Sequence, residues 1–154
     1  MKENKNLYKY LLFMLLAVDF IWARSSIGKV TGGKFVDSLG TTLEKFASKN
    51  PYPWFKDFLQ NVAIPNAKTF GTLTMWGELL TAVALAISVL YLLVNQKSNQ
   101  LINILLIAGL IGGMLLNATF WLASGWTSSS ADGLNLLMFL IQTVGLIFAL
   151  KLIK

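Results

Sequence analysis

With 154 residues, 55% of them hydrophobic, 13% charged and a formal net charge of +6, the chain does not fit an ordinary soluble domain and is typical of a small polytopic membrane protein. It has no Cys and no His, which excludes disulfides and metal sites built on thiolates or imidazoles, so we expect no metal ion. Its Lys residues are spread over tails and loops rather than gathered on one face, which favours membrane lipids over nucleic acid as the negatively charged partner.

The first apolar segment, from about residue 7 to 27, is long enough to cross a bilayer, which takes about 20 residues. Asp19 interrupts it and no small-residue cleavage site follows, so we interpret it as a membrane helix rather than a signal peptide. At helical spacing Asp19, Trp22 and Lys29 share one face, whereas Arg24 points to the other side. Arg24 lies near the end of this helix, where its long side chain can reach the lipid headgroups, and this accounts for a charged residue there. For Lys29 that explanation and a functional role remain equal alternatives.

The connection from residue 30 to 68 has a helical periodicity of its own. Apolar residues recur on one face from about residue 34 to 48, which predicts an amphipathic helix at the membrane surface. The string Asn50-Pro-Tyr-Pro53 ends this helix, and Pro53 suits the first position of a second one, from about residue 53 to 63. Plain anchoring in the interface and covering the mouth of a bundle are both left open for these helices.

A second membrane helix is predicted from about residue 69 to 94, and Glu78 is its one charged residue. A charge at membrane depth costs on the order of 3 kcal/mol or more unless it is paired or protonated, so Glu78 is a candidate functional residue. The alternative is a role in helix packing. Glu78 lies on a stripe of small and polar residues suited to close helix contact, while Trp76 largely faces elsewhere.

Two further membrane helices are predicted, from about residue 101 to 122 and from about residue 133 to 153. Small residues at every fourth position of the third helix lead to Asn117, a pattern typical of helix packing. Asp132 precedes the fourth helix in a position suited to capping it, and Gln142 lies on that helix's small and polar face.

These elements predict an all-α fold: a polytopic four-helix membrane bundle with amphipathic interfacial helices between its first and second spans. We expect a single integral membrane domain, residues 1–154, in the cytoplasmic membrane of a prokaryotic cell. Four spans put both termini on one side. We expect that side to be cytoplasmic because the two short ends are basic, although the Lys and Arg residues on the two sides nearly tie.

Depth along the helices gathers polar side chains from all four spans in one half of the bilayer. At about 1.5 Å per residue, Glu78 lies roughly 12 Å below the end of its helix and Asn117 roughly 8 Å below its own. We therefore predict a polar, aromatic-lined pocket beneath the amphipathic helices, in the outer half of the membrane. Its expected catalytic residues are Glu78, Lys29 and Asp19, and its expected ligand-binding residues are Trp22, Trp76, Asn117, Trp121 and Gln142.

Charge limits what such a pocket can do. Two carboxylates close together in low dielectric do not both ionise, so either one is protonated or Lys29 or Arg24 supplies a countercharge. Either arrangement suits proton exchange, and a quinone ring flanked by Trp residues with acid and amide donors is a sensible ligand. A lipid headgroup, a small anion or a purely structural network fits nearly as well. A channel is disfavoured because the polar layer lies in only one half.

Several strings in the first part of the chain are characteristic: Trp22 to Lys29, Thr31-Gly-Gly-Lys-Phe35, Phe46-Ala-Ser-Lys-Asn-Pro-Tyr-Pro-Trp54, Val62-Ala-Ile-Pro-Asn66 and Met75-Trp-Gly-Glu78. Together they resemble the DoxX family of small four-helix membrane proteins, which includes the membrane subunit of thiosulfate:quinone oxidoreductase. The resemblance covers roughly the first 90 residues, and fold transfers across such a family better than substrate. It implies a quinone-linked oxidoreductase subunit for thiosulfate or a related sulfur or thiol substrate, with Glu78 and Lys29 at matching positions.

An electron carrier is not evident in the sequence, since it has no Cys, His or cofactor motif. A partner would therefore do the sulfur chemistry, either a second oxidoreductase subunit or a soluble sulfur or redox protein. Assembly with a second copy of the chain is left open. The competing hypothesis is a non-catalytic membrane scaffold or a carrier of a small ligand or lipid, which anchors a partner through the basic, aromatic connection.

Overall fold

The structure is a computed structural model that describes residues 2–95, 97 and 99–151. Every regular element in these residues is a helix, which confirms the predicted all-α fold. Four helices are long and apolar enough to cross a membrane. They are α1 (Lys2–Gly32), α4 (Ala67–Asn95), α5 (Gln100–Ser124) and α6 (Ser129–Lys151).

The long helices form a bundle in which α1 packs against α4, α4 against α5, and α5 against α6. Contacts between α1 and α6 close it. Buried Leu and Val side chains fill the centre, among them Leu12, Leu15, Leu85, Val89 and Leu110. The outward side chains are also apolar, including Phe13, Phe20, Leu80, Leu115 and Ile147. So large an exposed apolar surface suits helices surrounded by lipid and not a soluble monomer.

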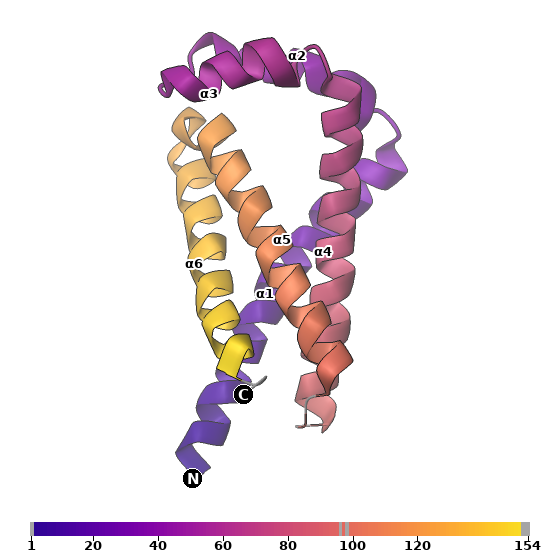
Figure 1. The fold of residues 1–154 in the computed structure, drawn as a ribbon, viewed down its shortest axis with the longest axis vertical. Coiled ribbons are helices and arrows are strands. Elements are labelled where there is room, and N and C mark those ends of the chain that lie inside the picture. Colours follow the sequence, from indigo (N-terminus) through magenta and orange to yellow (C-terminus); the bar gives the residue numbers. More distant parts are fainter. Residues whose placement is uncertain (1, 96, 98, 152–154) are drawn as a thin grey trace.

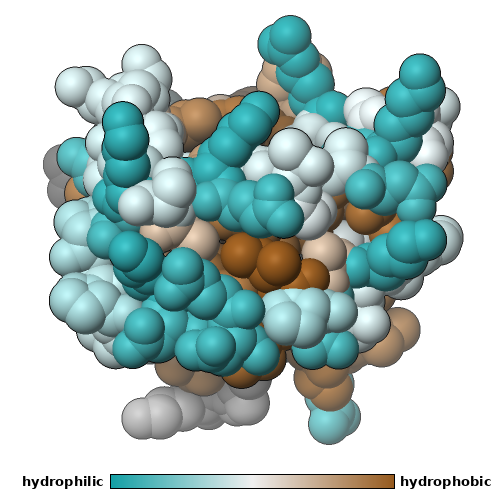
Figure 2. Space-filling view, turned by 90° about the horizontal axis from the view of Figure 1, so that it is seen from above, coloured by the Kyte–Doolittle hydropathy of each residue, from teal (hydrophilic) through white to brown (hydrophobic). Residues whose placement is uncertain are grey.

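Two shorter helices lie across one end of the bundle, at the end opposite to both termini (Figure 1). They are α2 (Phe35–Ser48) and α3 (Pro53–Phe58), and α3 continues through one π-helical turn, η1 (Leu59–Ala63). We call α2, α3 and η1 the roof. Its polar side chains cover most of the surface seen from that end, and apolar side chains are exposed at the centre (Figure 2).

The roof packs onto the bundle through the apolar face that the sequence predicts. Its buried side chains are Leu39, Leu43, Ala47, Phe55, Leu59 and Ala63, and Ala123 of α5 joins them. The approach of α2 to α4 is close, since a Cβ atom at Gly71 would lie 3.1 Å from the Cα of Val36. A side chain at residue 71 would therefore push α2 away from α4.

The ends of the roof helices follow from three residues. Gly33 has a φ of 65°, a conformation that favours glycine, and it turns the chain from α1 into α2. Pro53 is the first residue of α3, where its missing N–H costs nothing. Asn50 ties the turn between α2 and α3 to the end of α5, because its side-chain amide donates to the carbonyl oxygen of Leu122 at 3.0 Å.

Some predicted boundaries differ from the structure. Helix α1 continues to Gly32, beyond the expected end at residue 27, so Lys29 lies inside the helix. The predicted capping role of Asp132 is wrong, because α6 begins earlier and the Ser128 hydroxyl accepts the hydrogen bond from the Ala131 N–H. The expected end of the fourth helix at residue 153 lies outside the described residues.

Candidate functional site

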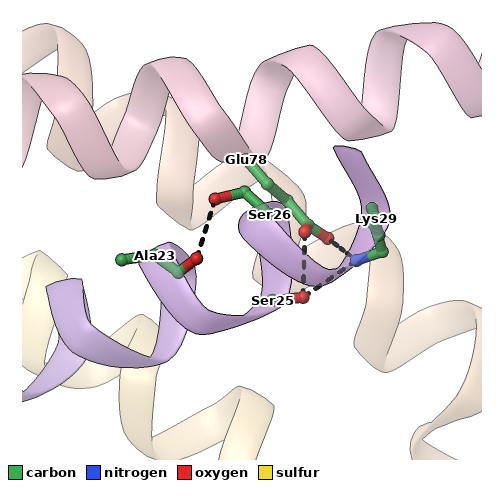
Figure 3. A network of polar contacts seen from close by, with 5 residues as sticks. All are labelled: Ala23, Ser25, Ser26, Lys29 and Glu78. Carbon is green, nitrogen blue, oxygen red and sulfur yellow. Dashed lines mark hydrogen bonds and ion pairs between the residues drawn. The ribbon is translucent and has the colours of Figure 1, made fainter. Parts of the chain in front are cut away.

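A buried ion pair joins α1 to α4 near the roof. Glu78 on α4 has no exposed surface, and its Oε1 atom accepts a hydrogen bond from the Lys29 ammonium group on α1. Its other oxygen, Oε2, accepts from the Ser25 hydroxyl at 2.9 Å. Ser25 also accepts a hydrogen bond from Lys29 at 2.9 Å, so the three side chains form a closed network (Figure 3). Both oxygens of this buried carboxylate are thus satisfied.

The local sequence explains why this network forms. Ser25 and Lys29 are four residues apart, and because α1 remains helical through Gly32 they lie on the same face, one turn from each other. Of the two cations that could balance Glu78, the structure brings Lys29 to it and leaves Arg24 exposed. Ser25 is a site residue that sequence reasoning missed, and its position one turn before Lys29 was the available signal.

Lys29 also lines an aromatic chamber between the roof and the bundle, with a volume of about 670 Å³. The Lys29 Nζ atom lies 4.9 Å from the ring centre of Phe35 and 5.7 Å from that of Phe120. The roof supplies most of the remaining wall, including Leu39, Phe46, Trp54, Phe55 and Phe58. Three residues of the wall, Thr42, Thr74 and Thr119, have hydroxyl groups. This space is called the aromatic chamber below.

The other predicted polar residues are not brought to the aromatic chamber. Asn117 donates a hydrogen bond to the Gln142 side chain at 2.7 Å, which joins α5 to α6 inside the bundle. Asp19 is buried on α1 and takes no part in the Lys29–Glu78 network. None of these three side chains is part of the chamber wall. The single polar pocket expected from depth is therefore divided into separate groups.

The predicted tryptophans do not line the aromatic chamber either. Trp22 is buried in the bundle, with its ring centre 6.1 Å from that of Phe120. Trp76 is 49% exposed on α4, so it faces outward from the bundle and away from the aromatic chamber. Trp121 donates a hydrogen bond from Nε1 to Asp132 at 2.6 Å and packs against Tyr52. Phenylalanines and Trp54 provide the aromatic wall instead, and the apolar face of the roof helices was the signal for most of them.

Comparisons with protein-family models, with curated proteins and with solved structures give no match to the chain. The geometry of the site itself indicates which chemistry it can support. The Lys29–Glu78 pair carries no net charge when both groups are ionised, and it presents N–H donors beside an apolar, aromatic space. Such a site can hydrogen-bond a neutral acceptor group and exchange a proton with it.

Proposed function

We propose that the chain is the membrane subunit of a quinone-linked oxidoreductase that acts on thiosulfate or a related sulfur or thiol compound. The observation that supports this best is the Lys29–Glu78 pair at the wall of an apolar chamber of about 670 Å³. Small-molecule sites typically occupy roughly 300–1,000 Å³ and combine apolar walls with a few polar groups. The resemblance of the Trp22–Lys29 and Met75–Glu78 strings to the DoxX family points the same way.

The residues of the aromatic chamber fit a quinone. Phe35 and Phe120 flank the Lys29 ammonium group, so an aromatic ring can pack against them while Lys29 donates a hydrogen bond to a ring oxygen. The aliphatic and aromatic side chains of the roof suit an isoprenoid tail. In our proposal the polar end of the ligand lies at α1 and α4, and its apolar end lies under α2 and α3.

Charge favours a neutral ligand over an anion. Glu78 already balances Lys29, so an anionic headgroup in the chamber would be repelled by the Glu78 carboxylate behind Lys29 while it is attracted by the ammonium group. Binding an anion would then require Glu78 to take up a proton, because an unpaired negative charge in low dielectric is costly. A carbonyl oxygen needs only a donor, which Lys29 supplies without a change in protonation.

A bound quinone supplies a group that accepts two electrons and two protons. Glu78 holds or releases one of these protons in our proposal, and the Ser25 hydroxyl connects its Oε2 atom to Lys29. The chain has no Cys and no His, so we assign the oxidation of the sulfur compound to a partner protein. That partner is a second subunit or a soluble redox protein, and it passes electrons to the quinone.

We further propose that the chain lies in the cytoplasmic membrane of a prokaryotic cell with both termini on the cytoplasmic side. Both termini lie at the end of the bundle opposite to the roof (Figure 1). The roof and the aromatic chamber then occupy the outer half of the membrane, where an extracytoplasmic sulfur-oxidising partner can reach them. The apolar side chains at the centre of the roof's polar surface offer that partner a contact (Figure 2).

The test combines ligand extraction with electron transfer. Protein purified in lipid nanodiscs is extracted with organic solvent and assayed for quinone, and membranes that contain the chain and its partner are assayed for electron transfer from thiosulfate or thiols to a soluble quinone. Glu78→Gln retains the shape of the side chain but not its proton exchange, so we expect the rate to fall at least about 100-fold. Glu44→Gln is the matched control, because Glu44 is exposed on α2.

A protein that carries no quinone, together with an electron-transfer rate that Glu78→Gln leaves unchanged, contradicts the proposal. Thermal unfolding of the Glu78→Gln protein distinguishes lost chemistry from lost fold. If the rate falls only in proportion to the folded fraction, Glu78 has a packing role.

A second candidate function is a non-catalytic scaffold or carrier of a lipid. The observation that favours it is the nearly complete absence of polar side chains from the wall of the aromatic chamber, which beyond Lys29 has three Thr hydroxyls. Such a wall suits an acyl chain as well as an isoprenoid. Extraction that yields a stoichiometric phospholipid or fatty acid and no quinone would establish this alternative.

A further inference from the structure

A second polar cluster lies inside the bundle, separate from the aromatic chamber. It consists of Asp19 and Trp22 on α1, Asn117 on α5 and Gln142 on α6, whose exposed fractions are 8%, 3%, 1% and 0%. Among the described residues, each has one buried side-chain atom without a hydrogen-bond partner: Asp19 Oδ1, Trp22 Nε1, Asn117 Oδ1 and Gln142 Nε2. Buried polar atoms are almost always paired, so four on three adjacent helices require an explanation.

The register of the helices puts Asp19 and Gln142 at the same level. A Cβ atom at Gly145 on α6 would lie 3.0 Å from Leu15 on α1 and 3.2 Å from Leu110 on α5, so these three residues mark one layer. Helices α1 and α6 run in opposite directions (Figure 1). Asp19 is four residues after Leu15, and Gln142 is three before Gly145. Asp19 therefore lies on the same face of α1 as Leu15, and Gln142 on the same face of α6 as Gly145. Each is about one turn nearer the roof, so their heights agree to within about one helical turn.

The remaining two side chains converge on the same region. Asn117 is hydrogen-bonded to Gln142, and the Gln142 amide reaches the backbone of α5 because Gly113 has no Cβ, which would lie 2.0 Å from Gln142 Nε2. Trp22 packs against the ring of Phe120, which is three residues after Asn117 on α5. Trp22 lies one turn after Asp19 on α1, so it is next to the same interior space.

We propose that these four residues form a buried water-binding site that hydrates the Asp19 carboxyl group. The unpartnered atoms are two acceptors, Asp19 Oδ1 and Asn117 Oδ1, and two donors, Trp22 Nε1 and Gln142 Nε2. A water molecule donates two hydrogen bonds and accepts two, and buried waters typically make about three hydrogen bonds to otherwise unpaired groups. One water, or a short chain of them, satisfies all four atoms.

The donor atoms decide the chemical class of the ligand. A metal cation at this place would meet the N–H groups of Trp22 and Gln142, whose hydrogen atoms carry partial positive charge, beside the two unpartnered oxygens. Water can turn its oxygen to those N–H groups and its hydrogens to the two oxygens. Asp19 lies about 9 Å along α1 from Ser25, and none of the four residues lines the aromatic chamber. The cluster is therefore a separate group of residues, and it borders the chamber wall only where Trp22 packs against Phe120.

The experiment is radiolytic hydroxyl-radical labelling of the full chain in phospholipid nanodiscs in H₂¹⁸O, with mass spectrometry of the tryptophans. Radicals form from bound water, so a buried aromatic side chain is labelled only where water lies beside it. Trp54 is 62% exposed and serves as the internal reference. We expect Trp22, although 3% exposed, to incorporate ¹⁸O at a rate within about tenfold of Trp54. An unlabelled Trp22 at a dose that saturates Trp54 overturns the proposal.

A pair of variants of similar size distinguishes labelling by water bound at this site from labelling by water that enters the bundle elsewhere. Asp19→Asn keeps an acceptor oxygen and should leave Trp22 labelling unchanged, whereas Asp19→Leu removes it and should lower that rate by at least about threefold relative to Trp54. A smaller fall in Asp19→Leu contradicts the site. If Asp19→Leu does not fold, Asn117→Leu against Asn117→Asp makes the same comparison on α5, with the same outcomes.

Discussion

Glu78 has no exposed surface, yet each of its carboxylate oxygens accepts a hydrogen bond, one from Lys29 and one from Ser25. A buried carboxylate so fully paired is stable only while its partners remain, because removing either leaves charge or a polar atom without compensation. The Lys29 side chain keeps 20% of its surface exposed, towards the aromatic chamber. This asymmetry makes Lys29 the group that a ligand can reach and Glu78 the group behind it.

We expect Lys29→Leu to lower the free energy of unfolding by about 3 kcal/mol, because it leaves the Glu78 charge buried without a counter-ion. Lys29→Leu combined with Glu78→Leu should cost about 1 kcal/mol or less, since apolar residues of similar volume replace a buried pair at little net cost. Denaturant titration in mixed micelles, followed by circular dichroism, measures both. A double variant no more stable than the single one would show that the pair is not the source of the loss.

At the scale of the helices, hydropathy and periodicity are sufficient to predict the four spans and the amphipathic face of α2, because both depend on local composition. The end of α1 is harder to predict from the sequence. A Lys at residue 29 is typical of a helix end at the headgroups, but α1 continues to Gly32, and Lys29 pairs with Glu78 on α4 from within the helix.

The sequence does not provide the rotation of each helix about its axis relative to its neighbours. Depth along an axis correctly indicates that Asp19, Asn117 and Gln142 are buried polar residues, but depth alone does not say which neighbour each one faces. Trp76 is a different case, because helical periodicity alone separates it from Glu78. It is two residues before Glu78, so at about 100° per residue it points some 200° away, and its 49% exposure follows.

The contact between α5 and α6 depends on one glycine, which provides a test at this scale. A methyl group at residue 113 would lie 2.0 Å from the Gln142 amide nitrogen, and Gln142 is fully buried, so its side chain has no open space to move into. We expect Gly113→Ala to destabilise the protein by about 2 kcal/mol through overpacking and loss of the hydrogen bond from Asn117.

Gly133→Ala is the matched control, because a Cβ at that position of α6 meets nothing within 4 Å, and it should be neutral or slightly stabilising. Thermal unfolding in detergent compares the two proteins. Equal melting temperatures for both would contradict the close contact at Gly113.

For the whole molecule, the absence of native Cys permits a direct test of orientation, since one introduced thiol is unique. Lys49 is exposed between α2 and α3, and Lys97 is exposed between α4 and α5 at the opposite end of the bundle. With the termini in the cytoplasm, an impermeant maleimide should label Lys49→Cys in intact cells and Lys97→Cys only after permeabilisation. The reverse pattern would put the roof and the aromatic chamber on the cytoplasmic side.

The hydrogen bond from Asn50 to Leu122 joins residues 72 positions apart, which has a consequence for biosynthesis. The chain leaves the ribosome in order, so α2 and α3 are made before α4 and α5 exist. The roof can pack on α4 as soon as that helix is made, but the turn between α2 and α3 is not fastened until the last turn of α5 is formed, because Asn50 bonds there and Ala123 completes the roof's apolar contacts. A hydrophobic ligand can therefore be enclosed as the third span is inserted, without later opening of a finished bundle.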